Sequence, residues 1–287
     1  MKSKSISILK KLEHADKRWV FLLVALAVLI PLIKPLRIPL KVSAPAKAFH
    51  QQIQKLPEGS LVLLSSDYDP GSKAELYPMT EAVLRHLFRK NLRVVILSLW
   101  PAGPPMVELA LERVIAERGG DKHYGIDWVD LGFKEGREAV MVDMGRSIRQ
   151  TFPVDYHGTP IGELPLMNEV QNYASFPLFI NLSVGYPGTK EYVQYAQSRF
   201  KMTMIAGAGA VSVPEYSAYL QSGQISGMLM GIAGCAEYEQ LIESPGLALI
   251  FMDAQSVGHL LIVVLIIVGN VIFFLVRRQE KWQSRKS

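Results

Sequence analysis

The chain is 287 residues long, 49% of its residues are apolar, and its formal net charge is +5. This length and composition exclude a disordered chain and allow one or two domains with a substantial apolar core. The single cysteine, Cys235, excludes an intramolecular disulfide and a cysteine-rich metal site.

The positive charge is concentrated in two basic tails, residues 1–18 and 277–287. Together the tails hold eleven Lys and Arg residues against three acidic residues, whereas residues 44–255 hold 17 Lys and Arg against 23 acidic residues. A nucleic-acid-binding protein carries its basic surface on the folded domain, where that surface contacts phosphates. The charge distribution therefore predicts no nucleic-acid partner.

The first apolar segment follows the N-terminal tail, and we expect it to form a transmembrane helix over residues 19–36. Residues 19–33 contain no charged side chain, and Trp19 is positioned to lie at the lipid headgroups. A cleaved signal peptide is the alternative, because residues 44–46 (Ala-Pro-Ala) resemble a cleavage site. Ten residues, three of them charged, separate the apolar run from that site, which favours an uncleaved anchor.

Residues 37–59 are polar and contain proline, and we expect them to form a stem that leads to a globular domain of residues 60–255. In that domain, short and nearly continuous apolar runs alternate with segments of helical periodicity. Continuous apolar strands are typical of a parallel sheet with helices on both faces. The sequence therefore predicts an α/β fold, a doubly wound, mostly parallel sheet domain flanked by two transmembrane helices. We expect strands at residues 61–66, 92–100, 126–133, 177–184 and 202–213, and helices at residues 75–91, 104–120, 136–152 and 189–200.

Three glycines stand four residues apart within residues 222–246, where we expect a helix that carries Gly223, Gly227 and Gly231 on one face. The apolar part, residues 225–236, is too short to cross a bilayer. Because glycine inside a helix costs about 1 kcal/mol relative to alanine, these glycines require close contact with another backbone. That backbone belongs either to the domain itself or to a second copy of the chain in a homo-oligomer.

Ligands of doubly wound sheets bind at the carboxyl ends of the strands, near the point where the strand order reverses. Polar and small residues at the predicted strand ends are therefore the candidate ligand-binding residues: Ser65, Ser66, Asp67, Asp69, Glu75, Ser98, Trp100, Asn181, Ser183, Gly185, Gly207 and Gly209. The alternative is that these Ser, Asp and Gly residues are ordinary turn formers.

The acidic segment after the first strand resembles the start of a calcium-binding loop. Asp67, Asp69 and Glu75 supply carboxylates, but Gly71 and Pro78 stand where such a loop requires oxygen ligands. A turn is therefore favoured over a divalent-cation site.

Two other motifs are incomplete. Residues 181–185 resemble the nucleophile elbow of hydrolases but lack its first glycine, and His157 is the one candidate base for Ser183. Residues 206–214 lack the third glycine of a dinucleotide-binding fingerprint. The sequence thus assigns no catalytic residue, no cofactor and no metal ligand.

The second apolar segment, residues 257–276, has 20 consecutive residues without Asp, Glu, Lys or Arg. A helix of this length spans about 30 Å, the thickness of the hydrocarbon core, so we expect a second transmembrane helix here. Because Lys and Arg concentrate in the tails, the positive-inside rule predicts cytoplasmic termini and an extracytoplasmic central domain. The inverted orientation stays open because four cations follow the first span, namely Lys34, Arg37, Lys41 and Lys47.

Three functional hypotheses follow from these features. The first is a two-span membrane protein that displays a non-catalytic α/β domain, which binds a small ligand or a partner protein. The second is a membrane-anchored hydrolase or metal-assisted enzyme that uses the strand-end residues Asp67, Asp69, Glu75 and Ser183. The third is an accessory subunit of a larger membrane complex. The expected partners are the lipid bilayer and either a second copy of the chain or other membrane subunits.

Overall fold

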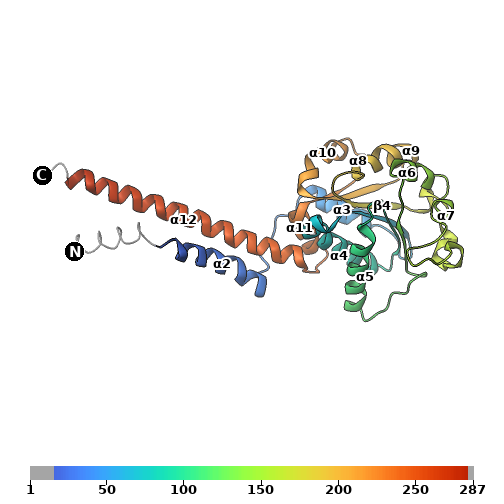
Figure 1. Ribbon diagram of the computed structural model, residues 1–287, viewed down its shortest axis with the longest axis horizontal. Coiled ribbons are helices and arrows are strands. Elements are labelled where there is room, and N and C mark those ends of the chain that lie inside the picture. The colour runs from blue at the N-terminus through green and yellow to red at the C-terminus, as the bar shows by residue number, and fades with distance from the viewer. Residues whose placement is uncertain (1–15, 284–287) are drawn as a thin grey trace. The chain divides into compact units, whose positions relative to one another are not determined.

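The computed structural model describes residues 16–283 (Figure 1). Residues 1–15 and 284–287, which belong to the two basic tails, therefore lie outside the described residues. The chain divides into two compact units. One is Pro39–Leu249, and the other combines the segments on either side of it.

The unit Pro39–Leu249 contains a six-stranded sheet in the order β3-β2-β1-β4-β5-β6. Every neighbouring pair of strands is parallel, so the predicted α/β fold is confirmed, with a wholly parallel sheet. The strands are β1 (Leu61–Asp67), β2 (Arg93–Ser98), β3 (Trp128–Phe133), β4 (Leu178–Ser183), β5 (Met204–Ala208) and β6 (Met228–Met230).

The continuous apolar runs of the central strands follow from their burial on both faces. All seven residues of β1 and all six of β4 are buried, because helices cover the sheet from both sides. The two strands pair in register from Val62 with Leu178 to Asp67 with Ser183. Polar residues at the ends of both strands are thereby brought together.

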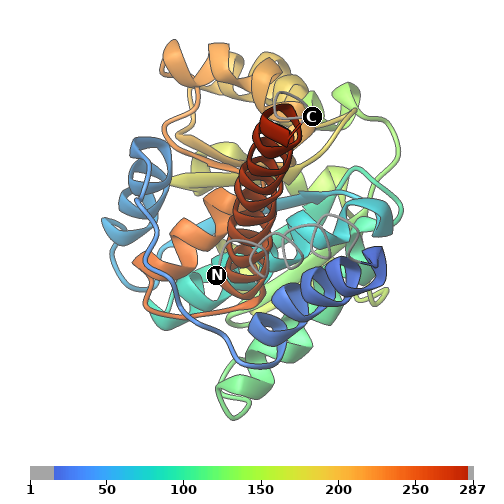
Figure 2. The same cartoon turned by 90° about the vertical axis from the view of Figure 1, so that its left-hand side faces the viewer.

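Helices form a layer on each face of the sheet (Figures 1 and 2). One layer consists of α3 (Ala44–Gln54), α4 (Lys73–Arg89), α5 (Gly103–Glu117) and α11 (Gly231–Leu241). The other consists of α6 (Glu138–Met144), α7 (Ile148–Thr151), α8 (Thr189–Tyr192), a π turn (Val193–Gln197), α9 (Ser198–Phe200) and α10 (Val213–Gln221). Short 3₁₀ turns at Pro70–Ser72, Ile161–Glu163, Pro165–Glu169, Tyr173–Ser175 and Ala210–Ser212 complete the connections.

Residues 37–59, the segment expected to form a stem, contain a helix that packs on the α/β unit. Residues 44–54 are the helix α3, whose Ala46, Phe49 and Ile53 are fully buried against the rest of the α/β unit. These three side chains are three and four residues apart and so lie on one helix face. The helix begins where the Ser43 hydroxyl accepts a hydrogen bond from the amide of Ala46. The polar composition of the segment concealed this narrow apolar face.

The predicted helix over residues 222–246 is wrong in its first part. Gly223 lies in a turn after α10 with a φ of 76°, residues 228–230 form β6, and Gly231 begins α11 with a φ of 58°. The three glycines therefore do not share a helix face. Pairing of β6 with β5 at the sheet edge overrides the local helical periodicity.

Gly227 nevertheless contacts another backbone closely. A Cβ atom at this position would lie 2.3 Å from the backbone nitrogen of Phe49 in α3. The contact is internal to the domain, so the glycines give no support to a homo-oligomer.

The second unit contains α2 (Lys17–Ile33) and most of α12 (Leu247–Gln283). Within α12, Leu247–Arg278 is long and apolar enough to cross a membrane, and its most apolar part is only 6% buried. At 17 residues, α2 is about 26 Å long, which is shorter than a typical hydrocarbon core. Among residues 16–283 there is thus one helix of spanning length, where the sequence predicted two.

Asp253 joins the two parts of this unit. Its buried carboxylate accepts hydrogen bonds from the amides of Leu36, Arg37 and Ile38, with N···O distances of 2.9, 2.8 and 3.0 Å. Arg37 has a φ of 56°, which turns consecutive amides toward the anion. The segment after α2 is therefore fixed to α12.

Candidate functional site

The candidate site lies at the carboxyl edge of the sheet. The chain builds β1, β2 and β3 toward one side and then β4, β5 and β6 toward the other, so the strand order reverses between β1 and β4. Open parallel sheets bind ligands in the crevice at such a switch point. Two features occur here, a buried polar network and a pocket in front of it.

Asp67, the last residue of β1, is the centre of the buried network. Its carboxylate accepts hydrogen bonds from the Leu99 amide at 2.6 Å, from the Asn181 side chain at 2.8 Å and from the Ser65 hydroxyl at 2.5 Å. The Ser98 hydroxyl lies 3.4 Å from the same carboxylate. Asp67 therefore connects β1 to the ends of both neighbouring strands.

The network continues from Asn181 to the start of α8. The side-chain oxygen of Asn181 accepts hydrogen bonds from the hydroxyls of Ser183 at 2.7 Å and Thr189 at 2.6 Å. The Thr189 amide in turn donates to the Ser183 hydroxyl at 3.0 Å. All three of these side chains are fully buried.

Burial raises the pKa of Asp67 from 3.8 to about 7, although its hydrogen bonds with Ser65, Leu99, Asn181 and Ser98 act in the opposite direction. The carboxyl group is fully buried and cannot touch a molecule in the pocket without a rearrangement. Its role in this arrangement is to fix the strand ends.

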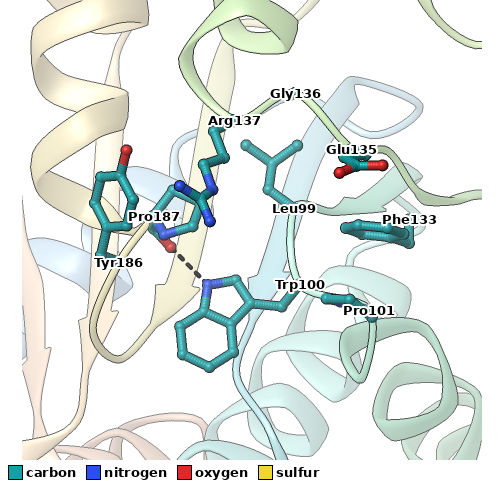
Figure 3. A pocket seen from close by; sticks show the side chains of 9 residues that line it. All are labelled: Leu99, Trp100, Pro101, Phe133, Glu135, Gly136, Arg137, Tyr186 and Pro187. Atoms are coloured by element: carbon teal, nitrogen blue, oxygen red, sulfur yellow. Dashed lines mark hydrogen bonds between the residues drawn. The ribbon is translucent and has the colours of Figure 1, made fainter.

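A pocket of about 330 Å³ lies at the ends of β2, β3 and β4. Figure 3 shows its lining side chains, which are Leu99, Trp100, Pro101, Phe133, Glu135, Gly136, Arg137, Tyr186 and Pro187. Leu99, whose amide donates to Asp67, is one of these lining residues, so the buried network positions one wall of the pocket.

Aromatic groups form much of the wall, and hydrogen bonds fix two of them. The indole Nε1 of Trp100 donates to the main-chain oxygen of Pro187 at 2.8 Å, and the Tyr186 hydroxyl donates to Glu138. The hydrogen bond from Tyr186 lowers the pKa of Glu138. Phe133 and Tyr186 are 39% and 52% exposed, so the pocket is open to solvent.

Arg137 is the principal charged group of the pocket. Its guanidinium lies 5.1 Å from the centre of the Tyr186 ring, a cation–π contact. Its φ is 48° and its ψ is −116°, a conformation that costs a residue with a side chain on the order of 1–3 kcal/mol. Such strain is common at ligand sites, where it holds a side chain in a required position.

The predicted site residues divide into two groups. The structure brings Asp67, Ser98, Asn181 and Ser183 together, but as buried partners of one another rather than as a pocket surface. Ser66 is also buried, and as the neighbour of Ser65 and Asp67 in a strand it points to the opposite face of the sheet.

Asp69 and Glu75 lie away from this network. The Asp69 carboxylate accepts a hydrogen bond from the Ser72 amide at 3.2 Å, and the Glu75 carboxylate accepts one from the Ala210 amide at 2.7 Å. The three carboxylates of the acidic segment are therefore engaged with different parts of the chain. Residues 16–283 contain no cluster of three His, Cys, Asp or Glu side chains arranged to hold a metal ion.

Gly207 and Gly209 serve packing around β5. A Cβ atom at Gly207 would lie 2.6 Å from the Leu182 side chain, and one at Gly209 would lie 3.2 Å from that of Val184. Neither glycine lines the pocket.

Sequence reasoning missed Phe133, Glu135, Arg137, Tyr186 and Pro187. The strand-end rule that selected Ser98 and Trp100 applies equally to the end of the third predicted strand, where Phe133 stands. Tyr186 and Pro187 follow the candidate Gly185 directly. The signal was therefore present, but polar residues were favoured over the aromatic residues that form the wall.

Comparison of the chain with protein-family models, with curated proteins and with solved structures gives no match.

Proposed function

We propose that this protein is a membrane-anchored, non-catalytic binding protein whose α/β domain binds a small ligand in the pocket at the ends of β2, β3 and β4. The observation that carries the proposal is the composition of this pocket. Three aromatic side chains, Trp100, Phe133 and Tyr186, line the pocket together with Arg137, whose backbone is strained and whose guanidinium lies over the Tyr186 ring. Pockets for small molecules combine mainly apolar walls with a few well-placed polar groups.

Binding is favoured over catalysis because the polar groups behind the pocket are occupied. The Ser183 hydroxyl is fully buried and hydrogen-bonded to Asn181 and Thr189, so it is poorly placed to attack a substrate. Asp67 is likewise buried and accepts several hydrogen bonds. These contacts suit a rigid scaffold for the pocket walls.

The proposed anchor consists of α12 and, as a second membrane-inserted helix, α2. The apolar side chains of α2 support this role, because Trp19, Phe21, Leu29 and Ile33 are between 51% and 75% exposed. A soluble helix buries such side chains. With both helices in the bilayer, the basic tails favour cytoplasmic termini and an extracytoplasmic α/β domain.

The location of the domain is testable with one introduced cysteine. Cys235 is fully buried, so a membrane-impermeant maleimide should leave the wild-type protein unlabelled in intact cells or spheroplasts. The variant Asn168→Cys carries an exposed thiol and should be labelled without lysis. Labelling that requires lysis would put the domain in the cytosol and reject the proposed orientation.

Ligand binding is tested by thermal-shift screening of the purified full chain in detergent. The compounds should include aromatic and aliphatic anions, cations, zwitterions and neutral molecules. We expect at least one class to stabilise the wild-type protein and the control Arg146→Met, which changes an exposed arginine outside the pocket. The stabilisation should be lost in Arg137→Met and in Trp100→Ala.

Binding that survives both pocket substitutions, or the absence of binding by every class, would reject the proposed function. Purification in mild detergent adds an independent result. A second protein that co-elutes in fixed ratio, with no ligand bound in the screen, would favour an accessory subunit instead.

A further inference from the structure

The pocket contains two opposite charges that do not pair with each other. Among the described ion pairs, neither Arg137 nor Glu135 has a partner, although both line the pocket and only Gly136 separates them in the sequence. In Figure 3 the guanidinium of Arg137 lies on the side of Tyr186 and Pro187, and the carboxylate of Glu135 lies on the side of Phe133. The charges thus face the pocket from two sides.

Within residues 16–283 no carboxylate forms an ion pair with Arg137, so its guanidinium can bind an anionic ligand group. The neighbouring carboxylate that could compete, Glu138, is engaged by the Tyr186 hydroxyl. Tyr186 contacts the guanidinium through its ring face, and this neutral side chain leaves the positive charge of Arg137 without a counter-ion. A guanidinium in this state matches a carboxylate, which it can bind through two parallel hydrogen bonds.

The space between the two charges is apolar. Trp100 has committed its indole N–H to Pro187, so it offers the pocket only its ring surface. Leu99 adds apolar surface between the charged groups, and Phe133 adds it beside Glu135 (Figure 3). A ligand that satisfies the pocket therefore needs an apolar body in addition to its charges.

We propose that the pocket binds a zwitterion of the amino-acid type with an apolar or aromatic side chain. The ligand carboxylate binds Arg137, the ligand ammonium binds Glu135, and the side chain packs on Trp100 and Phe133. This assignment rests on the proposed function, since it names the ligand class of the same pocket. Opposite charges on two sides of a cavity stabilise a dipolar molecule in one orientation and disfavour a molecule with one charge.

The experiment is isothermal titration calorimetry of the full chain in detergent at pH 7 with four compounds. Phenylalanine carries both charges and a ring, 3-phenylpropanoate lacks the ammonium, 2-phenylethylamine lacks the carboxylate, and glycine lacks the ring. We expect phenylalanine to bind at least about ten-fold more tightly than each of the others, the effect of one lost charged hydrogen bond or one unfilled apolar wall.

Two variants separate the roles of the charges. Arg137→Met should weaken the binding of phenylalanine about ten-fold while leaving the affinity for 2-phenylethylamine unchanged. Glu135→Gln should weaken the binding of phenylalanine to a similar degree while leaving the affinity for 3-phenylpropanoate unchanged. Arg146→Met and Glu163→Gln change exposed residues outside the pocket and should behave as wild type.

If 3-phenylpropanoate binds as tightly as phenylalanine and Glu135→Gln has no effect, the ligand class is wrong. The proposed function survives that result, because the pocket still binds a small molecule through Arg137. Failure of all four compounds also overturns the ligand class, and the broader screen with Trp100→Ala then decides separately whether the pocket binds anything.

Discussion

The indole of Trp100 donates a 2.8 Å hydrogen bond to the main-chain oxygen of Pro187. Trp100 follows β2 and Pro187 follows β4, the two strands on either side of β1. This bond therefore joins the loops that follow the two strands beside β1, and Leu99, the residue before Trp100, donates its amide to the buried carboxyl group of Asp67. The walls of the pocket and the network behind it form one connected structure.

Replacement of Trp100 by phenylalanine removes this bond and keeps an aromatic ring. We expect Trp100→Phe to lose about 0.5–1.5 kcal/mol of stability, because the carbonyl of Pro187 loses its partner. For a domain of this size that loss lowers the melting temperature by several degrees. Thermal unfolding of the full chain measures the loss, with Trp19→Phe, on the exposed α2, as the control. An unchanged melting temperature would mean that the bond contributes nothing to the loop arrangement.

Asp67→Asn tests the buried carboxyl group through its pH dependence. The pKa of Asp67 is raised from 3.8 to about 7, so the folded state holds a proton that the unfolded state releases between pH 4 and pH 7. The contribution of this group to stability is therefore full below pH 4 and is lost as the pH rises to 7. Asparagine does not titrate, so the stability of the variant does not decrease between pH 4 and pH 7 on account of this position.

We accordingly expect Asp67→Asn to be less stable than wild type at pH 5 by about 1–3 kcal/mol, because its amide places a donor against the donor of Asn181. The difference should narrow as the pH rises to 7. Melting temperatures across this range give the measurement. Asp69→Asn changes only a turn cap and should keep the wild-type profile, whereas a constant difference for Asp67→Asn would contradict the raised pKa.

Asn181→Asp places a second carboxyl group beside Asp67. Two buried carboxyl groups in hydrogen-bond contact cannot both ionise without a large electrostatic cost, so they share a proton at acid pH. We expect the variant to fold at pH 5. Between pH 5 and pH 8 its melting temperature should fall much more steeply than that of wild type. The exposed substitution Asn168→Asp is the matched control and should follow wild type. Parallel profiles for the two variants would argue against the network.

Gly227→Ala should destabilise the domain by about 1–3 kcal/mol, the usual cost of overpacking. The new methyl group would lie 2.3 Å from the backbone nitrogen of Phe49, and a helix backbone cannot move aside cheaply. Gly162→Ala, where the nearest neighbour is 3.9 Å away, should be close to neutral. Light scattering should give the same oligomeric state for both variants and wild type, since the contact is internal. A change of oligomeric state without loss of stability would assign Gly227 to an interface between copies.

Asp253→Ala should release the segment after α2. The substitution leaves the amides of Leu36, Arg37 and Ile38 without their acceptor. We expect trypsin to cleave after Arg37 at least several times faster than in wild type, as mass spectrometry of a digestion time course would reveal. Gln255→Ala, two residues along the same helix, should keep the wild-type rate. Equal rates for all three proteins would show that the carboxylate does not hold the segment.

The residues that were hardest to predict have their partners far away in the sequence. The apolar face of α3 consists of only three residues. The surface on which it packs includes Gly227, which contacts Phe49 and lies almost 180 residues later in the sequence. The strand β6 has only three residues, too few for a periodic signal, and it forms because β5 offers an open edge. The periodicity of a short segment does not show which distant residues the segment contacts, so neither element was predicted.

The candidate site divides in the same way. The strand-end rule selected Asp67, Ser98, Asn181 and Ser183 correctly as neighbours, because parallel strands bring their carboxyl ends to one edge. It did not predict that these side chains would hydrogen-bond one another and become fully buried. The aromatic residues in front of them then became the accessible surface.

Sequence alone was sufficient for the parallel α/β domain and for one helix long and apolar enough to cross a membrane. Both features depend on the burial or lipid exposure of continuous apolar runs, which a single segment encodes by itself. The pocket was decided by the tertiary structure. Trp100 and Pro187 become neighbours only once β2, β1 and β4 are assembled. Hydrogen bonding between distant segments also determines which polar side chains are occupied within the protein and which can contact a ligand.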